Sequence, residues 1–260
     1  MSALYTIGQL KEKINRRRPM SESEAKQLND YFKVGATYSS NALEGNSLTL
    51  TETKVLLEDG ITVGGKPLKD IYEATGHADA YDFMAEIARS GDLEITEDII
   101  LKLHELFYQR LDKENAGKYR DVRVIITGTD YVPPSPAKVP DEMKKFISEL
   151  KDKAAKLHPV ILAAYAHRRL VDIHPFVDGN GRTARLLMNL ILINKGYFVV
   201  SIPPIRRPEY LDALRVAQRK DKPSDNLFNG LIAECVHETQ KDYCRMFEIP
   251  IKDSNDRNAR

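Results

Sequence analysis

Apolar residues recur at the spacing of an α-helix along almost the whole of this 260-residue chain, which leaves few folds open to it. Ile7, Leu10 and Ile14 mark the first such segment, which should end near Pro19 because proline cannot continue a helix. Later segments with the same pattern are 51–60, 68–89, 96–111, 140–156, 158–171, 182–195, 208–220 and 227–247. The periodicity therefore predicts an all-α bundle.

The second helix carries signals for both of its ends. Ser21 followed by Glu24 is a capping-box pattern, so the helix should begin there. The pattern continues to Glu44, with Gly35 as a point where the helix could break, and Gly45 suits a left-handed C-terminal stop.

Only one stretch favours strands. Residues 122–126 read Val-Arg-Val-Ile-Ile, a Gly-Thr-Asp turn follows at 128–130, and Tyr131-Val132 precede two prolines. This pattern predicts one short β-hairpin, whose second strand the prolines keep short. A lone hairpin is marginal in water, so it should lie on the helical bundle as a flap.

Composition excludes several classes. The chain has 39 Lys and Arg against 38 Asp and Glu, a formal charge of +1, which does not suit a general polyanion binder. Its longest aliphatic-rich run, 186–193, is too short to span a membrane, and the N-terminus lacks a signal-peptide pattern. Cys235 and Cys244 match no metal-ligand motif and are expected to be reduced thiols. We therefore expect a cytoplasmic protein with no nucleic-acid or membrane partner.

The most informative segment is His174-Pro-Phe-Val-Asp-Gly-Asn-Gly-Arg-Thr-Ala-Arg185, between two apolar helices. Its Gly-Asn-Gly loop permits close approach of a ligand, and its backbone amides with the next helix N-terminus form an anion site. Arg182 and Arg185 lie in the first turn of that helix, where each cation is unfavourable by roughly 0.3–1 kcal/mol unless an anion binds between them. These features predict phosphate binding.

Two other residues of the segment complete a reactive site. Asp178 beside a polyphosphate suits Mg²⁺, which uses few protein ligands and keeps several waters. His174 titrates near neutrality, so it can take a proton from an attacking hydroxyl. Each residue alone has an ordinary structural explanation, but one twelve-residue loop that supplies all of them is unusual. His167, seven residues before His174, is expected to pack behind the site.

The segment HPFVDGNGRTAR resembles the signature HPFx(D/E)GNGRxxR of the Fic (filamentation induced by cAMP) family. The flanking GKYR at 117–120 and YVPPSP at 131–136 agree, and the resemblance extends over roughly residues 60–250. It implies a Fic-type helical bundle that transfers AMP from ATP to a hydroxyl of a target protein. It also implies that the flap around Val122 to Val132 pairs with an extended segment of that target.

The resemblance also implies a role for each site residue. His174 would be the general base, Asp178 would bind Mg²⁺, and Arg185 would hold the γ-phosphate of ATP. The residues implied to surround the other phosphates are Gly179, Asn180, Gly181 and Arg182.

An upstream segment resembles the inhibitory motif (S/T)xxxE(G/N) of regulated Fic proteins. Ser40 and Glu44 lie four residues apart, on one face of the second helix, and Gly45 follows. In regulated relatives this glutamate pairs with the second arginine of the signature, which is Arg185 here, and misplaces ATP. The resemblance thus implies an N-terminal inhibitory helix.

We expect an N-terminal helical region at 1–60, a catalytic core at 61–250 and a flexible tail at 251–260. The favoured function is an adenylyltransferase inhibited by Glu44. Two alternatives stay open: a hydrolase that removes AMP through the same site, and a non-enzymatic nucleotide-sensing regulator. The target protein, the type of residue modified, the adenine contacts and self-association are not determined by the sequence.

Overall fold

The computed structural model describes residues 3–17, 20–62, 64–91 and 93–251. The expectation of an all-α bundle is confirmed, since these residues form helices and no strand. The helices are α1 (Ala3–Arg16), α2 (Glu22–Ala42), α3 (Leu50–Asp59), α4 (Leu68–Ile87), α5 (Glu97–Tyr108), α6 (Val139–Ala154), α7 (Pro159–Ile173), α8 (Asn180–Asn194), α9 (Arg207–Ala217) and α10 (Asn226–Met246). Two short 3₁₀ turns, Pro136–Lys138 and Pro204–Arg206, precede α6 and α9.

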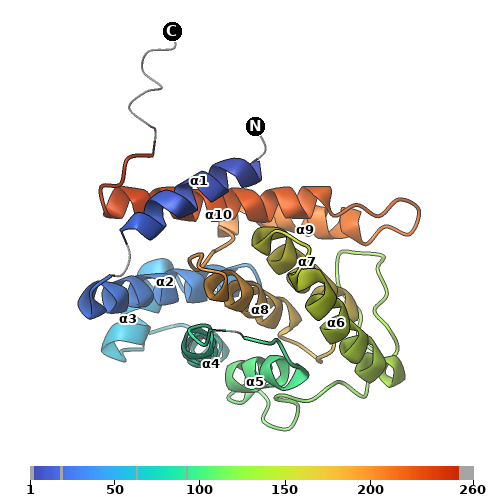
Figure 1. Cartoon of the computed structure of the whole chain (residues 1–260). Coiled ribbons are helices and arrows are strands. Elements are labelled where there is room, and N and C mark those ends of the chain that lie inside the picture. Colours follow the sequence, from blue (N-terminus) through green and yellow to red (C-terminus); the bar gives the residue numbers. More distant parts are fainter. Residues whose placement is uncertain (1–2, 18–19, 63, 92, 252–260) are drawn as a thin grey trace.

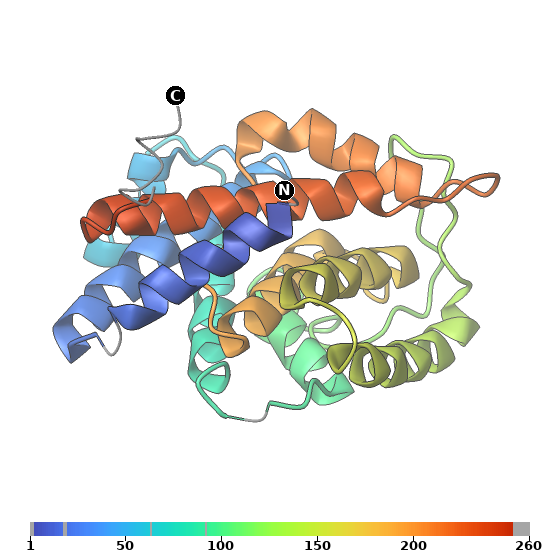
Figure 2. The same cartoon turned by 45° about the horizontal axis from the view of Figure 1, so that its top comes forward.

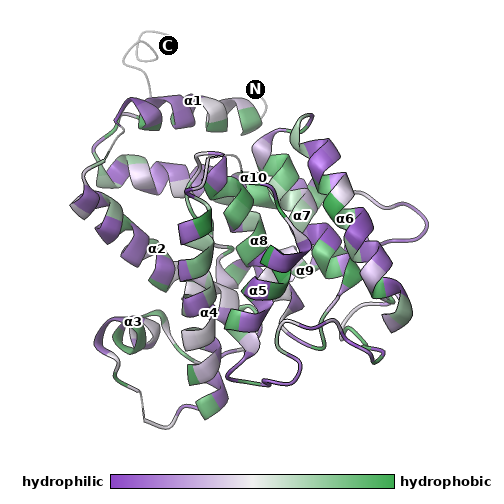
Figure 3. Cartoon of the chain, turned by 60° about the horizontal axis from the view of Figure 1, so that its bottom comes forward, coloured by the Kyte–Doolittle hydropathy of each residue, from purple (hydrophilic) through white to green (hydrophobic). Residues whose placement is uncertain are grey.

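Helix α8 is the centre of the bundle (Figure 1). Every residue from Arg182 to Leu192 is buried, as expected for a helix that is apolar on nearly all sides. It packs most extensively against α7 and also contacts α4, α5 and α2. Hydropathy colouring shows the contrast between this apolar helix and the mixed outer helices (Figure 3). The N-terminus of α8 is therefore held on several sides.

The N-terminal helices cover one side of this core. Helix α1 lies along α10, where its apolar stripe of Ile7, Leu10 and Ile14 is buried (Figure 2). The capping box at Ser21 and Glu24 is present, and α2 runs without the break considered at Gly35. Helix α2 thereby brings its last turn to α8.

The expected β-hairpin is wrong, because residues 122–132 form an irregular loop in the described structure. The guanidinium of Arg120 donates to the backbone oxygens of Val122 and Pro134, at 3.0 and 2.6 Å. One buried side chain thus holds both ends of the loop, and Pro133 and Pro134 have no amide hydrogens for a strand ladder. Ile125 is 92% exposed, so this apolar side chain does not anchor the segment to the bundle. Local strand propensity is therefore not enough to form a hairpin here, since a lone hairpin needs a surface to pack on.

Three smaller expectations concern the rest of the chain. Cys235 and Cys244 are both buried and unpaired. Of the expected tail at 251–260, residues 252–260 lie outside the described residues. Among the described helices, none combines the length and apolar character needed to cross a bilayer.

Candidate active site

The loop between α7 and α8 is held by its own sequence. His174 ends α7 in a left-handed conformation with φ 50°, and Gly179 begins α8 with φ 77°. The side chain of Asn180 closes the loop, because its amide group accepts from the Phe176 amide and donates to the Phe176 carbonyl, both at 2.9 Å. These two hydrogen bonds fix the Asn180 side chain within the loop.

The orientation of His174 suits a general base. Its Nδ1 lies 3.1 Å from the carbonyl oxygen of Val171. A carbonyl only accepts, so Nδ1 carries the hydrogen and Nε2 keeps its lone pair in the neutral ring. Burial lowers the pKa of His174 below its ordinary value, although the contact with Val171 opposes this shift. The imidazole is consequently neutral and able to accept a proton at pH 7.

Asp178 has one carboxylate oxygen engaged and its side chain is 52% exposed. Oδ1 accepts from the backbone amide of Gly179 at 2.6 Å and lies 3.5 Å from a guanidinium nitrogen of Arg182. The described residues contain no cluster of three or more metal-ligating side chains. A Mg²⁺ site built from one carboxylate and substrate phosphates does not need such a cluster, so the residues present fit this ion.

The N-terminus of α8 is already covered by a carboxylate. A methyl group added at Gly181 would lie 2.5 Å from Oε1 of Glu44 and 3.1 Å from Nη1 of Arg185. Since helix N-termini attract anions, Glu44 occupies the position that an anionic ligand would favour. The absence of a side chain at Gly181 is what permits this approach.

The structure brings the proposed inhibitory residues onto Arg185. Its Nη2 donates to Oε1 of Glu44 at 2.7 Å and to the carbonyl oxygen of Ser40 at 2.9 Å, while Nε donates to the Ser40 hydroxyl at 2.9 Å. Burial disfavours the Glu44 carboxylate, but Arg185, Arg182 and Arg207 together outweigh burial, and the pKa of Glu44 is lowered. The pair is thus ionised, and its Glu44 side is 36% exposed.

Arg182 takes a different partner from Arg185. It forms a 2.7 Å ion pair with Glu73 of α4 and lies over the ring of Phe107 at 4.5 Å. Glu73 is buried and also accepts from the side chain of Asn46 at 2.9 Å. Sequence reasoning missed Glu73, because no local pattern marks a glutamate on a buried helix face as the partner of an arginine about a hundred residues later.

His104 is a second residue that sequence reasoning missed. Its Nδ1 accepts from the amide of Gly117 at 3.0 Å, and its Nε2 donates to the carbonyl oxygen of Asp178 at 3.1 Å. The ring stacks on Phe176, with centroids 3.7 Å apart. Burial lowers the pKa of His104 to about 4, which keeps the ring neutral in this dual role. A lone histidine in the helix at 96–111 was the only signal for this residue.

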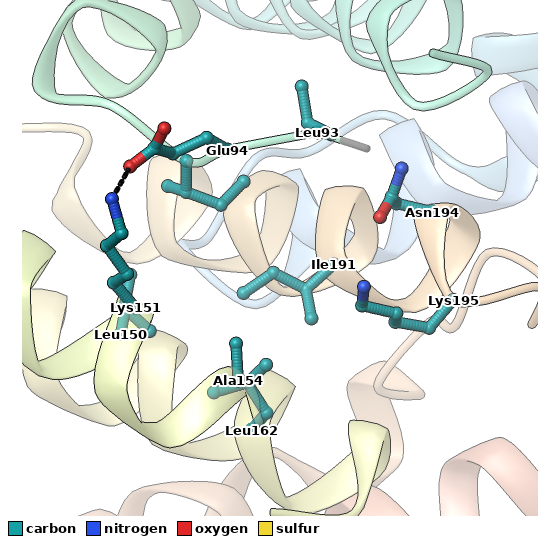
Figure 4. A pocket seen from close by; sticks show the side chains of 10 residues that line it. Leu93, Glu94, Leu150, Lys151, Ala154, Leu162, Ile191, Asn194 and Lys195 are labelled. Carbon is teal, nitrogen blue, oxygen red and sulfur yellow. Dashed lines mark hydrogen bonds and ion pairs between the residues drawn. The ribbon is translucent and has the colours of Figure 1, made fainter. Parts of the chain in front are cut away.

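Two cavities adjoin elements of the site, one beside the loop at 128–131 and one at the C-terminal end of α8. One of about 770 Å³ is lined by the loop residues Gly128 to Tyr131 and by the C-terminal half of α9. Another of about 330 Å³ lies at the C-terminal end of α8, between Leu150, Leu162 and Ile191 (Figure 4). Only the first adjoins the loop expected to bind a target, and the second contains none of the expected site residues.

Similarity to known proteins agrees with this geometry. A sequence profile of the Fic/DOC family matches residues 94–192. A Fic domain-containing signalling protein from Bacteroides thetaiotaomicron has the same fold with a TM-score of 0.82, 32% identity, and coverage of 91% of this chain and 95% of that one. This chain belongs to the Fic family. Fic-1 from C. elegans is similar too, with a TM-score of 0.83 and 30% identity over 95% of this chain and 72% of that one.

A curated Fic relative carries an activity in its name. The protein adenylyltransferase Fic of Drosophila persimilis is 39% identical over 205 residues, which is 78% of this chain and 39% of the relative. The chain therefore spans about two-fifths of the length of that relative.

Proposed function

We propose that this Fic protein transfers AMP from ATP to a hydroxyl side chain of a target protein and is inhibited by Glu44. The observation that carries the proposal is the carboxylate of Glu44 on the N-terminus of α8, paired with Arg185. An anion in that position competes with a phosphate for the same amides and the same guanidinium. The name of the Drosophila persimilis relative supports the activity.

The chain's own residues account for the chemistry. The unprotonated Nε2 of His174 takes the proton of the target hydroxyl, whose oxygen bonds to the α-phosphorus of ATP as the bond to pyrophosphate breaks. The amides at the start of α8, from Asn180 to Arg182, stabilise phosphate charge, and Arg185 holds the γ-phosphate after Glu44 leaves. Asp178 would hold Mg²⁺, which would neutralise part of the phosphate charge. Positioning and charge stabilisation are most of the catalysis in such a reaction.

The target segment is proposed to bind along the loop around Val122 to Val132. These two side chains are 52% and 74% exposed, and Arg120 holds both ends of the loop close to the backbone of His174. An extended chain that paired with this loop would complete hydrogen bonds that the loop does not make internally. The proposed catalytic core is 61–250, and the unpaired thiols Cys235 and Cys244 support a cytoplasmic site of action.

Removal of AMP is a second candidate, favoured by one observation. The carboxylate of Glu44 lies within electrostatic reach of His174 and raises its pKa, against the larger opposite effect of burial. A carboxylate so placed can orient a water molecule toward a phosphorus atom. In that reaction Glu44 would be required, whereas in AMP transfer it would inhibit.

The test compares the wild-type protein with Glu44→Gly and Glu44→Gln, using ATP labelled at the α-phosphate and Mg²⁺. We expect label transfer to protein to rise at least about tenfold in both variants, because neither replacement carries the charge that pairs with Arg185. The double variant Glu44→Gly/His174→Ala is the matched control and should not transfer label. Unchanged labelling after His174→Ala would refute the role of His174 as the general base.

The same proteins separate the two reactions. A target labelled by Glu44→Gly protein is purified and incubated with the wild-type protein. Release of AMP by the wild-type protein, lost in Glu44→Gly, would assign Glu44 to hydrolysis. Neither transfer nor release with any variant would contradict an enzymatic function.

A further inference from the structure

Arg185 has one hydrogen-bond partner that does not come from the inhibitory helix. Three of its bonds go to Ser40 and Glu44, at the C-terminal end of α2. A fourth goes from Nη1 to the hydroxyl of Tyr210 in α9, at 3.3 Å. When Glu44 is displaced, the contact with Tyr210 can persist, because the Tyr210 hydroxyl binds Nη1 of Arg185 and not Glu44.

The hydroxyl of Tyr210 is itself oriented by a histidine. Arg185 donates to this oxygen, so the hydroxyl hydrogen is available to another acceptor, and Nε2 of His167 lies 3.2 Å away. That bond requires an unprotonated Nε2. Burial and the Arg185 cation hold the pKa of His167 well below its ordinary value, and burial raises the pKa of Tyr210. Both groups therefore stay neutral. Donation from Arg185 to Tyr210 to His167 uses the hydroxyl hydrogen, which the other neutral tautomer of His167 would leave without this acceptor.

The arrangement is maintained at a cost to stability. With the hydrogen on Nδ1, His167 has a buried N–H that finds no partner among the described residues. An unsatisfied buried group destabilises the folded protein, and an apolar side chain at this position would avoid that cost. His167 is also enclosed by aromatic rings, with Tyr210 and Phe228 at centroid distances of 5.7 and 5.0 Å. Because His167 is polar, buried and only partly hydrogen-bonded, we infer that it has a role beyond packing.

Helix α7 links this support to the reacting end of the site. His167 lies in α7 and His174 is its C-terminal cap, seven residues later. Two helical turns correspond to about 10 Å along the axis, and α7 is buried against α8 along this stretch. Helix α7 thus helps to fix the distance between His174, the proposed base, and Arg185, which would hold the γ-phosphate of ATP.

We propose that His167 and Tyr210 are positioning residues that hold Arg185 in place for the γ-phosphate of ATP, through Nη1, whereas Glu44 binds Nη2. This inference depends on the proposed binding of the γ-phosphate by Arg185. Neither residue needs to touch the reacting atoms, since both act through the guanidinium. The distinctive consequence is that their loss should weaken binding of a nucleotide with a γ-phosphate and spare one without it.

The experiment measures equilibrium binding of ATP and of AMP, with Mg²⁺, to the full chain carrying Glu44→Gly and His174→Ala. This parent has no inhibitory carboxylate and should not turn ATP over. Tyr210→Phe removes only the hydroxyl, and we expect about three- to tenfold weaker ATP binding, the effect of one hydrogen bond, with AMP binding changed less than twofold. His167→Leu should have the same effect, whereas His167→Gln, which keeps an acceptor, should retain most of the ATP affinity.

A double-mutant cycle distinguishes positioning from a general packing defect. If His167 acts through Tyr210, adding His167→Leu to Tyr210→Phe should cause no further loss of ATP affinity. Parallel losses for ATP and AMP, or additive losses in the double variant, would overturn the inference. If His167→Leu does not fold, as judged by thermal unfolding, the comparison of Tyr210→Phe with the parent decides alone.

The parent protein tests the assumption beneath the inference. If the parent binds ATP no more tightly than AMP, Arg185 does not hold the γ-phosphate, and this part of the proposed function fails together with the inference. If the parent prefers ATP and the Tyr210→Phe variant keeps that preference in full, only the positioning role is refuted.

Discussion

Replacing His104 by phenylalanine should destabilise the protein by an amount that shrinks as the pH falls. Phenylalanine can keep the stacking on Phe176, but it removes the bonds to the Gly117 amide and the Asp178 carbonyl. Both backbone groups are partly buried, and an unsatisfied group costs about 1–3 kcal/mol. We therefore expect a loss of about 2–6 kcal/mol in the free energy of unfolding at pH 7.5, given two such groups.

The pH dependence follows from the buried neutral ring. The pKa of His104 is about 4 in the folded protein, against an ordinary 6.5, so the unfolded chain takes up the proton first as the pH falls. This linkage lowers the free energy of unfolding of the wild-type protein by about 2 kcal/mol between pH 7.5 and pH 5. Phenylalanine has no proton to bind. The difference between the two proteins should therefore shrink by about 2 kcal/mol over that interval.

Urea unfolding at pH 7.5, 6 and 5, followed by circular dichroism, measures both quantities. His77 is also buried, and its pKa falls to about 3, but it is present in both proteins and cancels in the difference. A difference that stayed constant from pH 7.5 to 5 would show that His104 is not held neutral by the fold. A loss well below 1 kcal/mol at pH 7.5 would show that its two hydrogen bonds do not support the loop.

Three further predictions follow from single contacts. Because burial lowers the pKa of His174, the acid limb of AMP transfer by a deregulated variant should have its midpoint below pH 6.5, measured from initial rates. Arg120→Met should speed amide hydrogen exchange in the loop that follows, because the guanidinium holds both ends of that loop; unchanged exchange would contradict this. Gly76→Ala should cost about 1–3 kcal/mol in urea unfolding, since its methyl would overlap the Phe107 carbonyl, whereas Gly35→Ala meets no atom within 4 Å and should not destabilise.

The helices were predictable where their end signals are local. Ser21 and Glu24 form the capping box that their spacing predicts, and Gly60 ends α3 in the left-handed conformation. The loop that contains His174 and Asp178 was equally accessible, because its glycines and its position between two apolar helices are all features of adjacent residues. Such signals need no knowledge of how the helices pack.

The absence of the β-hairpin was not predictable, because it depends on contacts that are not local in sequence. Residues 122–126 have strand propensity, but a ladder also needs donors on the facing segment, and Pro133 and Pro134 provide none. Arg120 then binds the carbonyls at both ends of the loop. The Arg120 side chain thus binds backbone carbonyls that strand pairing would otherwise use. The periodicity of apolar residues cannot predict the direction of such a side chain.

Contacts between helices far apart in the chain could not be predicted from local sequence patterns either. Glu73 and Arg182 are separated by more than a hundred residues, as are Glu44 and Arg185. The resemblance to the inhibitory motif of regulated Fic proteins indicated the second contact, but nothing comparable indicated the first. Such pairs depend on the packing of α2 and α4 against α8, which is set by the whole core.

The two arginines at the N-terminus of α8 show how a displaceable inhibitor can be distinguished from a permanent structural partner. Both cations are unfavourable at that end of a helix, and each is neutralised by a carboxylate from another helix or its following turn. The Glu73 side chain is only 5% exposed and also binds Asn46, so displacing it would leave several buried polar groups unpaired. The Glu44 side chain is 36% exposed, and it shares Arg185 with Tyr210 of α9, a partner from outside the inhibitory helix. A phosphate arriving from solvent can therefore replace Glu44 far more readily than Glu73, which is why inhibition should act through Arg185 while Arg182 stays paired in both states.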